Sequence, residues 1–196
     1  MIPLEDAVHL CIDMQRIFSK GGVWETPWME RVLPVVAEIA ARHKERTIFT
    51  RFITPQTADQ RPGQWRQYYQ RWAAATREHL QPDQLELVSD LARFVPPAHI
   101  VDKPAYSAFY LSGLDVFLRD KGVRCLVVTG AETDVCVLAT VVAAVDRGFR
   151  VVIVEDALCS SSDAGHEALM TIYRTRMQEQ IDLINSRELS AVWSTR

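Results

Sequence analysis

Short apolar runs and longer stretches with helical spacing alternate along this chain. The short runs are rich in β-branched residues, which is typical of strands that are buried on both faces. They predict six strands, at residues 7–12, 47–53, 98–102, 124–129, 151–154 and 181–184. The helical spacing predicts five helices, at residues 28–44, 112–120, 134–147, 164–178 and 186–193. Residues 83–94 fit either a helix or an ordered loop.

Residues of capping type stand where several of these helices begin or end. Ser112, the polar cluster at residues 160–163 and Ser186 precede apolar helical stretches. Gly148 follows one and is a candidate for its C-terminal cap.

The order of these elements predicts the fold class. Strands that alternate with helices predict a single α/β domain over residues 1–196, with a three-layer α/β/α arrangement and a six-stranded, mostly parallel sheet. In such sheets, ligand sites form beyond the carboxyl ends of the strands. Asp13, Lys103 and Cys136 each fall at such an end. We therefore expect these three side chains to share one edge of the sheet.

Composition narrows the classes of protein that remain. The chain has 196 residues, 48% hydrophobic and 24% charged, with a net charge of −3. This balance offers no basic field for nucleic acid or an anionic membrane, and no apolar run approaches the roughly 18 residues of a membrane span. Residues 1–6 lack the pattern of a signal peptide. Four cysteines without metal-binding spacing favour a reduced, cytoplasmic protein.

The stretch at residues 127–138 carries the clearest chemical signal. It begins as a buried strand, Gly130 interrupts it, and Thr133 and Asp134 are helix-capping types. Cys136 is therefore predicted in the first turn of a helix, where the helix dipole favours thiolate over thiol. A cysteine nucleophile needs a base, for which Asp13 is the candidate, and Lys103 would organise the two groups. Backbone N–H groups of the turn could receive an oxyanion.

Three motifs together resemble a known family. They are Ile12-Asp13-Met14-Gln15, the run from Lys103 to Phe109, and the run from Gly130 to Val137. In order and spacing they resemble the isochorismatase-like cysteine hydrolases, which include nicotinamidases, N-carbamoylsarcosine amidohydrolases, ureide hydrolases and isochorismatase itself. The resemblance extends over essentially the whole chain. It implies an isochorismatase-like, Rossmann-like fold and an assembly of two or four copies.

The resemblance also implies a site and a reaction. Asp13, Lys103 and Cys136 would form the catalytic triad, and the N–H groups of Glu132 and Cys136 the oxyanion hole, beside a cis peptide bond between Ala131 and Glu132. The reaction would be attack on a small amide, carbamoyl or ureide carbonyl, followed by hydrolysis of a thioester on Cys136, without a cofactor.

Two departures from relatives refine this expectation. Nicotinamidases carry an Asp-x-His…His metal site after the second strand, whereas residues 45–78 contain no histidine and only one aspartate, Asp59. We therefore expect no catalytic metal. Isochorismatases proper lack the nucleophilic cysteine, so Cys136 favours C–N hydrolysis.

Several residues flank the predicted site in the sequence. We expect the substrate pocket to be lined by Gln15, Phe18, Trp24, Phe52, Tyr106 and Phe109. These aromatic side chains suit a small planar amide or ureide. The aromatic segment (residues 61–77) mixes cations with aromatic rings, and it fits either a lid over the site or a subunit interface.

Other interpretations remain open from the sequence. Cys136 alone could be structural, and the chain could be a catalytically silent binding or scaffold protein. A thiol redox sensor that pairs Cys136 with Cys159, taken as a second exposed thiol, is a third hypothesis. A Cys–His dyad with His166 is less favoured than a partly exposed histidine at a helix start. Cys11 and Cys125 are expected in the core.

Overall fold

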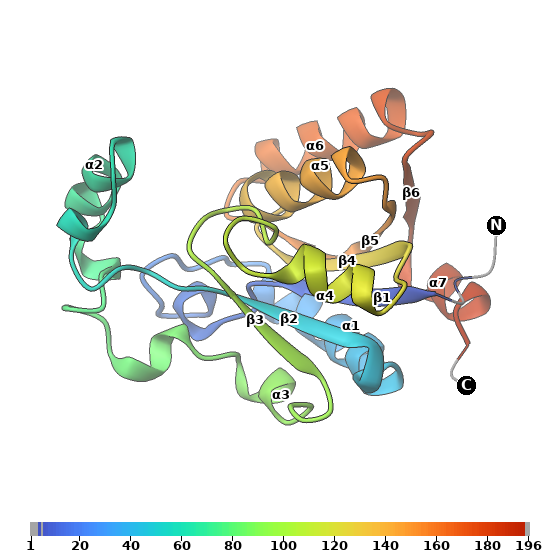
Figure 1. Cartoon of the computed structure of the whole chain (residues 1–196), viewed down its shortest axis with the longest axis horizontal. Helices are drawn as coiled ribbons and strands as arrows, with labels where there is room; N and C mark the ends of the chain where they lie inside the picture. The colour runs from blue at the N-terminus through green and yellow to red at the C-terminus, as the bar shows by residue number, and fades with distance from the viewer. Residues whose placement is uncertain (1–3, 5, 195–196) are drawn as a thin grey trace.

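Six strands form one wholly parallel sheet in the computed structural model, which describes residue 4 and residues 6–194 (Figure 1). The strands are β1 (Ala7–Ile12), β2 (Thr47–Phe52), β3 (His99–Lys103), β4 (Cys125–Ala131), β5 (Arg150–Cys159) and β6 (Ile181–Ile184). They are ordered β3-β2-β1-β4-β5-β6, and every neighbouring pair is parallel. The predicted six-stranded parallel sheet is confirmed.

Helices cover both faces of the sheet (Figure 1). One face carries α1 (Met29–Arg42), α3 (Ser89–Ala92) and α7 (Ser186–Val192). The other carries α4 (Leu114–Asp120), α5 (Leu138–Asp146) and α6 (Asp163–Arg176). The remaining helix, α2 (Gln64–Arg71), lies beyond the carboxyl ends of the strands rather than on a face of the sheet (Figure 1).

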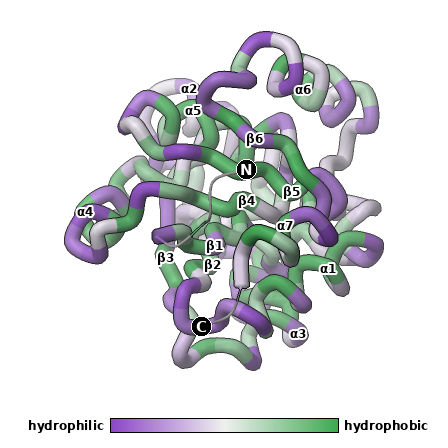
Figure 2. The backbone as a smooth tube through the Cα atoms, turned by 90° about the vertical axis from the view of Figure 1, so that its right-hand side faces the viewer, coloured by the Kyte–Doolittle hydropathy of each residue, from purple (hydrophilic) through white to green (hydrophobic). Residues whose placement is uncertain are grey.

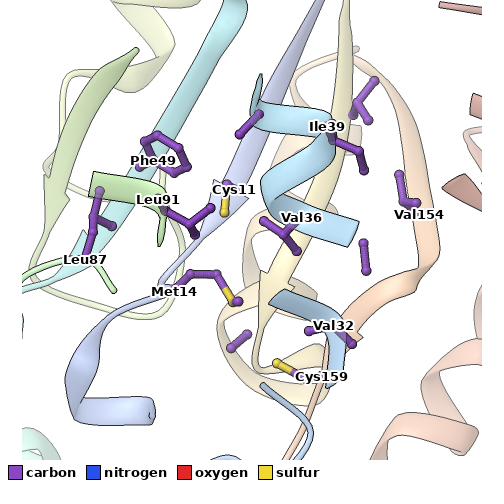
Figure 3. Close-up of a cluster of buried hydrophobic side chains, with 14 of the residues drawn as sticks. Cys11, Met14, Val32, Val36, Ile39, Phe49, Leu87, Leu91, Val154 and Cys159 are labelled. Atoms are coloured by element: carbon purple, nitrogen blue, oxygen red, sulfur yellow. The ribbon is translucent and has the colours of Figure 1, made fainter. Parts of the chain in front are cut away.

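Alternating residues of the central strands build a separate core on each side. In β1, Cys11 packs in the cluster beneath α1, whereas Leu10 and Ile12 pack beneath α4 and α5. The apolar strands run between more polar outer turns in Figure 2. Figure 3 shows Val32, Val36 and Ile39 of α1 among the side chains of the first cluster. Burial on both faces explains why these strands read as continuous apolar runs.

Short turns complete the chain between these elements. Tight 3₁₀ turns occur at Arg16–Phe18, Lys44–Arg46, Ala58–Gln60, Ala73–Ala75 and Pro82–Leu85. The segment at residues 83–94, which the sequence left open, thus combines the end of a 3₁₀ turn with the short helix α3. None of the helices in the described part of the chain has the length and apolar character needed to cross a membrane.

Two of the predicted helix caps are confirmed, whereas the predicted cap at Ser112 is wrong, because Gly113 is the N-cap residue of α4. Ser162 accepts a hydrogen bond from the Gly165 N–H at the start of α6, and Gly148 follows α5 with a φ of 81°. The predicted cap at Ser186 is wrong, because Asn185 caps α7. Its side chain accepts from the Glu188 N–H while the Glu188 carboxylate accepts from the Asn185 N–H, a reciprocal capping box.

Candidate active site

The site lies where the chain changes direction across the sheet. From β1 the strands proceed outward to β2 and β3, then the chain returns to β4 beside β1 and proceeds outward to β5 and β6. In α/β sheets, ligands bind at the crevice that such a reversal leaves at the carboxyl ends. Asp13 directly follows β1, and the turn that holds Cys136 follows β4.

Asp13 and Lys103 form a buried ion pair across this edge. Lys103 Nζ lies 2.6 Å from Asp13 Oδ2, and neither side chain is exposed to solvent. Lys103 also donates to the Ala105 carbonyl at 3.0 Å. The Thr50 hydroxyl on the intervening strand β2 donates to Asp13 Oδ1 at 2.6 Å and accepts from the Asp13 N–H at 3.1 Å. Both carboxylate oxygens are therefore held in fixed positions.

Thr50 was not predicted as a site residue from the sequence. A threonine inside a buried strand was the available signal, because a buried hydroxyl requires a hydrogen-bond partner.

Lys103 keeps its positive charge despite its burial. Burial alone would lower the pKa of Lys103, but the Asp13 carboxylate and Cys136 outweigh it, so the pKa lies above its ordinary value. The ammonium is consequently a fixed charge beside the thiol.

Cys136 lies against both members of the ion pair. Asp13 and Lys103 both lie close enough to its thiol to act on its charge, and the residue is 5% exposed. Burial raises the pKa of the Cys136 thiol well above its ordinary value. Lys103 opposes that shift and Asp13 adds to it. The expectation that the helix start favours a thiolate is therefore wrong for the free protein, because the cost of desolvating the anion exceeds the stabilisation from Lys103.

The turn that carries Cys136 differs from the predicted helix start. Residues Thr133–Val137 form a π-helical turn, and α5 begins only at Leu138. Thr133 does not cap this helix: its hydroxyl contacts the Cys159 carbonyl at 3.2 Å and His166 Nδ1 at 2.9 Å. The partners available on β5 and α6 thus replace the expected cap.

Two further contacts fix the same turn. The Asp134 carboxylate accepts from the Ser160 hydroxyl at 2.5 Å rather than capping the helix. The peptide bond between Ala131 and Glu132 is cis, as predicted. His166 contacts Thr133 and lies against the Trp28 ring, with ring centroids 5.1 Å apart.

A cavity of about 440 Å³ opens above Cys136. Four of the predicted pocket residues line it, namely Phe18, Trp24, Phe52 and Tyr106. The remaining lining residues are Gly22, Val23, Glu25, Tyr68, Trp72, Glu132, Val135 and Ser161. Glu132 was predicted for the oxyanion hole, and Gly22, Val23, Glu25 and Val135 lie close in sequence to predicted site residues, whereas Tyr68, Trp72 and Ser161 come from segments that lie away from them in the sequence.

Two predicted pocket residues lie elsewhere. Gln15 is fully buried, its amide donates to the Leu85 carbonyl at 2.7 Å, and its amide oxygen accepts from the Phe52 N–H at 2.7 Å. Phe109 packs on Phe149, with ring centroids 5.9 Å apart. Neither side chain is in the cavity lining, so these two assignments are corrected.

The aromatic segment packs over the cavity. Tyr68 and Trp72 lie beside Trp24, with ring centroids 6.1 and 6.3 Å apart, and Trp65 lies 4.9 Å from Tyr106. The segment therefore has the position of a lid. Its use as a subunit interface stays a prediction.

The three cysteines other than Cys136 are all buried. Cys159, expected as an exposed thiol, is fully buried beneath α1 (Figure 3). Cys11 and Cys125 are buried as predicted. Within the described residues, no three His, Cys, Asp or Glu side chains converge as metal ligands. Asp59, the one aspartate of residues 45–78, pairs instead with Arg66 at 3.3 Å.

The sequence of this chain matches a known protein family and is similar to several of its members. The family model of the isochorismatase domain matches residues 7–184. The chain is 33% identical over 86 residues to an uncharacterised isochorismatase family protein, PncA, of Bacillus subtilis, covering 44% of this chain and 47% of that protein. It is 40% identical over 70 residues to the ureidoacrylate amidohydrolase RutB of Methylorubrum extorquens, covering 36% of this chain and 27% of that protein. The chain spans about half the length of the curated relatives that it matches.

Solved structures share the fold over nearly the whole chain. A cysteine hydrolase from Pseudomonas syringae pv. phaseolicola superposes with a TM-score of 0.81 at 23% identity, covering 96% of this chain and 92% of that chain. This likeness agrees with the predicted isochorismatase-like fold.

Proposed function

The chain belongs to the isochorismatase family of hydrolases, and from that premise we propose that it hydrolyses a C–N bond of a small amide, carbamoyl or ureide compound, with Cys136 as the nucleophile. The observation that carries this proposal is the buried Asp13–Lys103 pair, which lies against the Cys136 thiol below the cavity. Burying two charges is costly, and such pairs next to a nucleophile are typical of active sites.

The proposed reaction begins with proton transfer from the thiol. As the Cys136 sulfur attacks the carbonyl carbon, Asp13 takes the thiol proton and becomes neutral, and the Lys103 ammonium stabilises the negative charge that develops on the sulfur. The N–H groups of Glu132 and Cys136 receive the oxyanion. The C–N bond then breaks, Asp13 returns the proton to the leaving nitrogen, and a thioester remains on Cys136. Water attacks the thioester with Asp13 as base, which releases the acid and restores the thiol.

Two further observations support this chemistry. Burial raises the pKa of the Cys136 thiol, so the thiol requires a base at the moment of attack, and Asp13 is the carboxylate that acts on it. One of the curated relatives is named an amidohydrolase that acts on ureidoacrylate.

The test is ammonia release from a panel of small primary amides and ureides. We expect Cys136→Ala and Cys136→Ser to lower turnover by at least about a thousandfold, because no other group forms the acyl intermediate. Cys125→Ala is the matched control and should retain turnover, because Cys125 begins β4 whereas Cys136 lies in the turn beyond the other end of that strand. Mass spectrometry of acid-quenched enzyme should find the acyl group on Cys136. Full turnover by Cys136→Ala would refute the proposal.

The other hypotheses receive less support. Redox-sensing thiols are usually exposed and have a low pKa, whereas burial raises the pKa of both Cys136 and Cys159. A silent scaffold protein would release no ammonia from any amide and would form no adduct.

A further inference from the structure

The charged side chains that line the cavity are both acidic. They are Glu25 at its rim and the half-buried Glu132 beside Cys136. In the part of the chain that the structure describes, the lining includes no Lys, Arg or His. Lys103 lies beneath the cavity, but Asp13 balances its charge at 2.6 Å. The field in the cavity therefore favours a positive ligand and opposes a negative one.

Two arginines of the aromatic segment, Arg61 and Arg71, contact groups outside the cavity lining or the ring of Trp72. Arg61 donates to the Pro104 carbonyl at 2.6 Å and lies 5.2 Å above the Trp65 ring. Arg71 is exposed and lies 6.0 Å from the Trp72 centroid. Neither residue lines the cavity. A substrate carboxylate would thus find no cation in the lining to receive it.

The aromatic rings that line the cavity are inclined to one another at different angles. Trp24 is at the centre of the group, with Tyr68 inclined to it by 48° and Trp72 by 76°. Ring faces carry partial negative charge, and several faces turned toward one space bind ammonium groups by cation–π attraction. A neutral planar ligand would gain nothing from the charges of the Glu25 and Glu132 carboxylates in the lining.

Glu132 is held in place next to these rings. Its Oε1 accepts from the Ser161 N–H at 3.0 Å, which fixes the carboxylate on the wall of the cavity. Its charge acts on Tyr68 and Tyr106, since it contributes to the raised pKa of both hydroxyls after burial and other neighbours. The negative group and the ring faces therefore belong to the same space.

From this arrangement we infer that the cavity selects amides whose non-reacting end carries an alkylated ammonium group and excludes amides that carry a carboxylate there. The rings of Trp24, Tyr68 and Trp72 surround the cation, and Glu132 supplies its countercharge. This inference rests on the proposed function, because it names the substrate class of the same site.

The test uses three amides of similar size that differ in charge. Trimethylammonioacetamide is a permanent cation, 3,3-dimethylbutanamide is its neutral isostere, and malonamate carries a carboxylate. We expect kcat/KM for ammonia release to be about tenfold higher for the cation than for the neutral isostere. We expect it to be about a hundredfold higher than for malonamate. Raising the ionic strength should reduce the preference.

Charge-neutralising variants locate the origin of the preference. Glu132→Gln retains an oxygen for the Ser161 N–H but removes the charge. The ratio of kcat/KM for the cation to kcat/KM for the neutral isostere should therefore fall to the value that the aromatic rings produce without the carboxylate. Glu38→Gln removes the same charge from the exposed face of α1, and it should leave the ratio unchanged. The ratio is the readout, because Glu132 also contributes its backbone N–H to the proposed oxyanion hole.

The outcomes separate this inference from the proposed function. Equal hydrolysis of the cation and its isostere, or a preference for malonamate, would overturn the inference and leave the proposed hydrolysis standing. If no amide is hydrolysed, calorimetry with Cys136→Ala decides. Tighter binding of the cation than of its isostere would support the inference for binding alone, whereas equal or absent binding would overturn it as well.

Discussion

Asp13 and Lys103 are joined across an intervening strand. Lys103 ends β3 and Asp13 follows β1, so the ion pair spans β2, whose Thr50 holds the second carboxylate oxygen. Asp13 itself has a φ of 49°, a conformation uncommon for residues other than glycine. Desolvation offsets much of the attraction within a buried pair, so this pair is better explained by its chemistry than by its stability.

Removing one member of this pair should destabilise the fold more than removing both. Asp13→Asn or Lys103→Met leaves one buried group without its partner, and each variant should lower the free energy of unfolding by about 3–5 kcal/mol. The double variant should be more stable than the sum of the two losses predicts, by several kcal/mol. Urea unfolding of all four proteins measures this coupling. All three variants should lack turnover.

An exposed pair provides the control for this cycle. Arg16 and Asp83 lie 2.5 Å apart, but both are well exposed. The same cycle with Arg16→Met and Asp83→Asn should give a coupling below about 1 kcal/mol. If the Asp13–Lys103 losses were simply additive, the argument from desolvation would be wrong.

At the scale of elements, the approach of β1 to β4 brings Asp13 near Cys136. Gly130 of β4 is paired with Ile12 of β1, and a Cβ at Gly130 would lie 2.1 Å from the Ile12 carbonyl oxygen. Gly130 also has a φ of 109°. Only glycine permits the two strands this separation at the point where Asp13 and the turn that holds Cys136 follow them.

Two glycine substitutions should distinguish the effect of a close contact between strands from the effect of a positive φ angle alone. Gly148 has a φ of 81° with open space around its Cβ position, so Gly148→Ala should cost only about 1 kcal/mol and keep kcat. Gly130→Ala must displace β1 next to Asp13, so it should cost more than about 2 kcal/mol and abolish turnover. Urea unfolding and steady-state kinetics test both variants. Similar losses in the two would show that the close contact is unimportant.

The elements also show what the sequence can and cannot predict. Apolar periodicity identified the six strands because burial on both faces dictates their composition. It misplaced the start of the helix after β4, since Thr133 and Asp134 are capping types, but Thr133 bonds to Cys159 and His166 and Asp134 to Ser160 instead. Gln15 and Phe109 were assigned to the pocket by adjacency, but adjacency to a strand end does not fix the direction of a side chain. Gln15 instead satisfies backbone groups of residues far along the chain.

For the whole molecule, two buried histidines connect distant segments. His9 in β1 bridges the hydroxyls of Thr47 and Thr129 on the neighbouring strands, at 3.2 and 2.8 Å. His43 stacks on Trp193, with ring centroids 3.7 Å apart. From the sequence these histidines were merely scattered. Their partners lie 38 to 150 positions away, so no local pattern reveals them.

These histidines should make stability depend on pH. Burial lowers the pKa of His9 to about 3 and that of His43 to about 4, so both are neutral in the folded protein near neutral pH. In the unfolded chain a histidine takes up a proton below about pH 6.5. The unfolded state therefore binds more protons between pH 6.5 and 3, and the free energy of unfolding falls as the pH is lowered through this range.

The contribution of His9 can be measured directly because its imidazole is fully buried. From pH 7 to pH 5 it should lower the free energy of unfolding by about 2 kcal/mol. His9→Gln keeps groups that can bond to both threonines but does not titrate, so its stability should fall less over the same interval. Urea unfolding at pH 7, 6 and 5 compares the two proteins, with the exposed His79→Gln as the control. If His9→Gln lost as much stability between pH 7 and pH 5 as the unmodified chain, protonation of His9 could not be the source of the pH dependence.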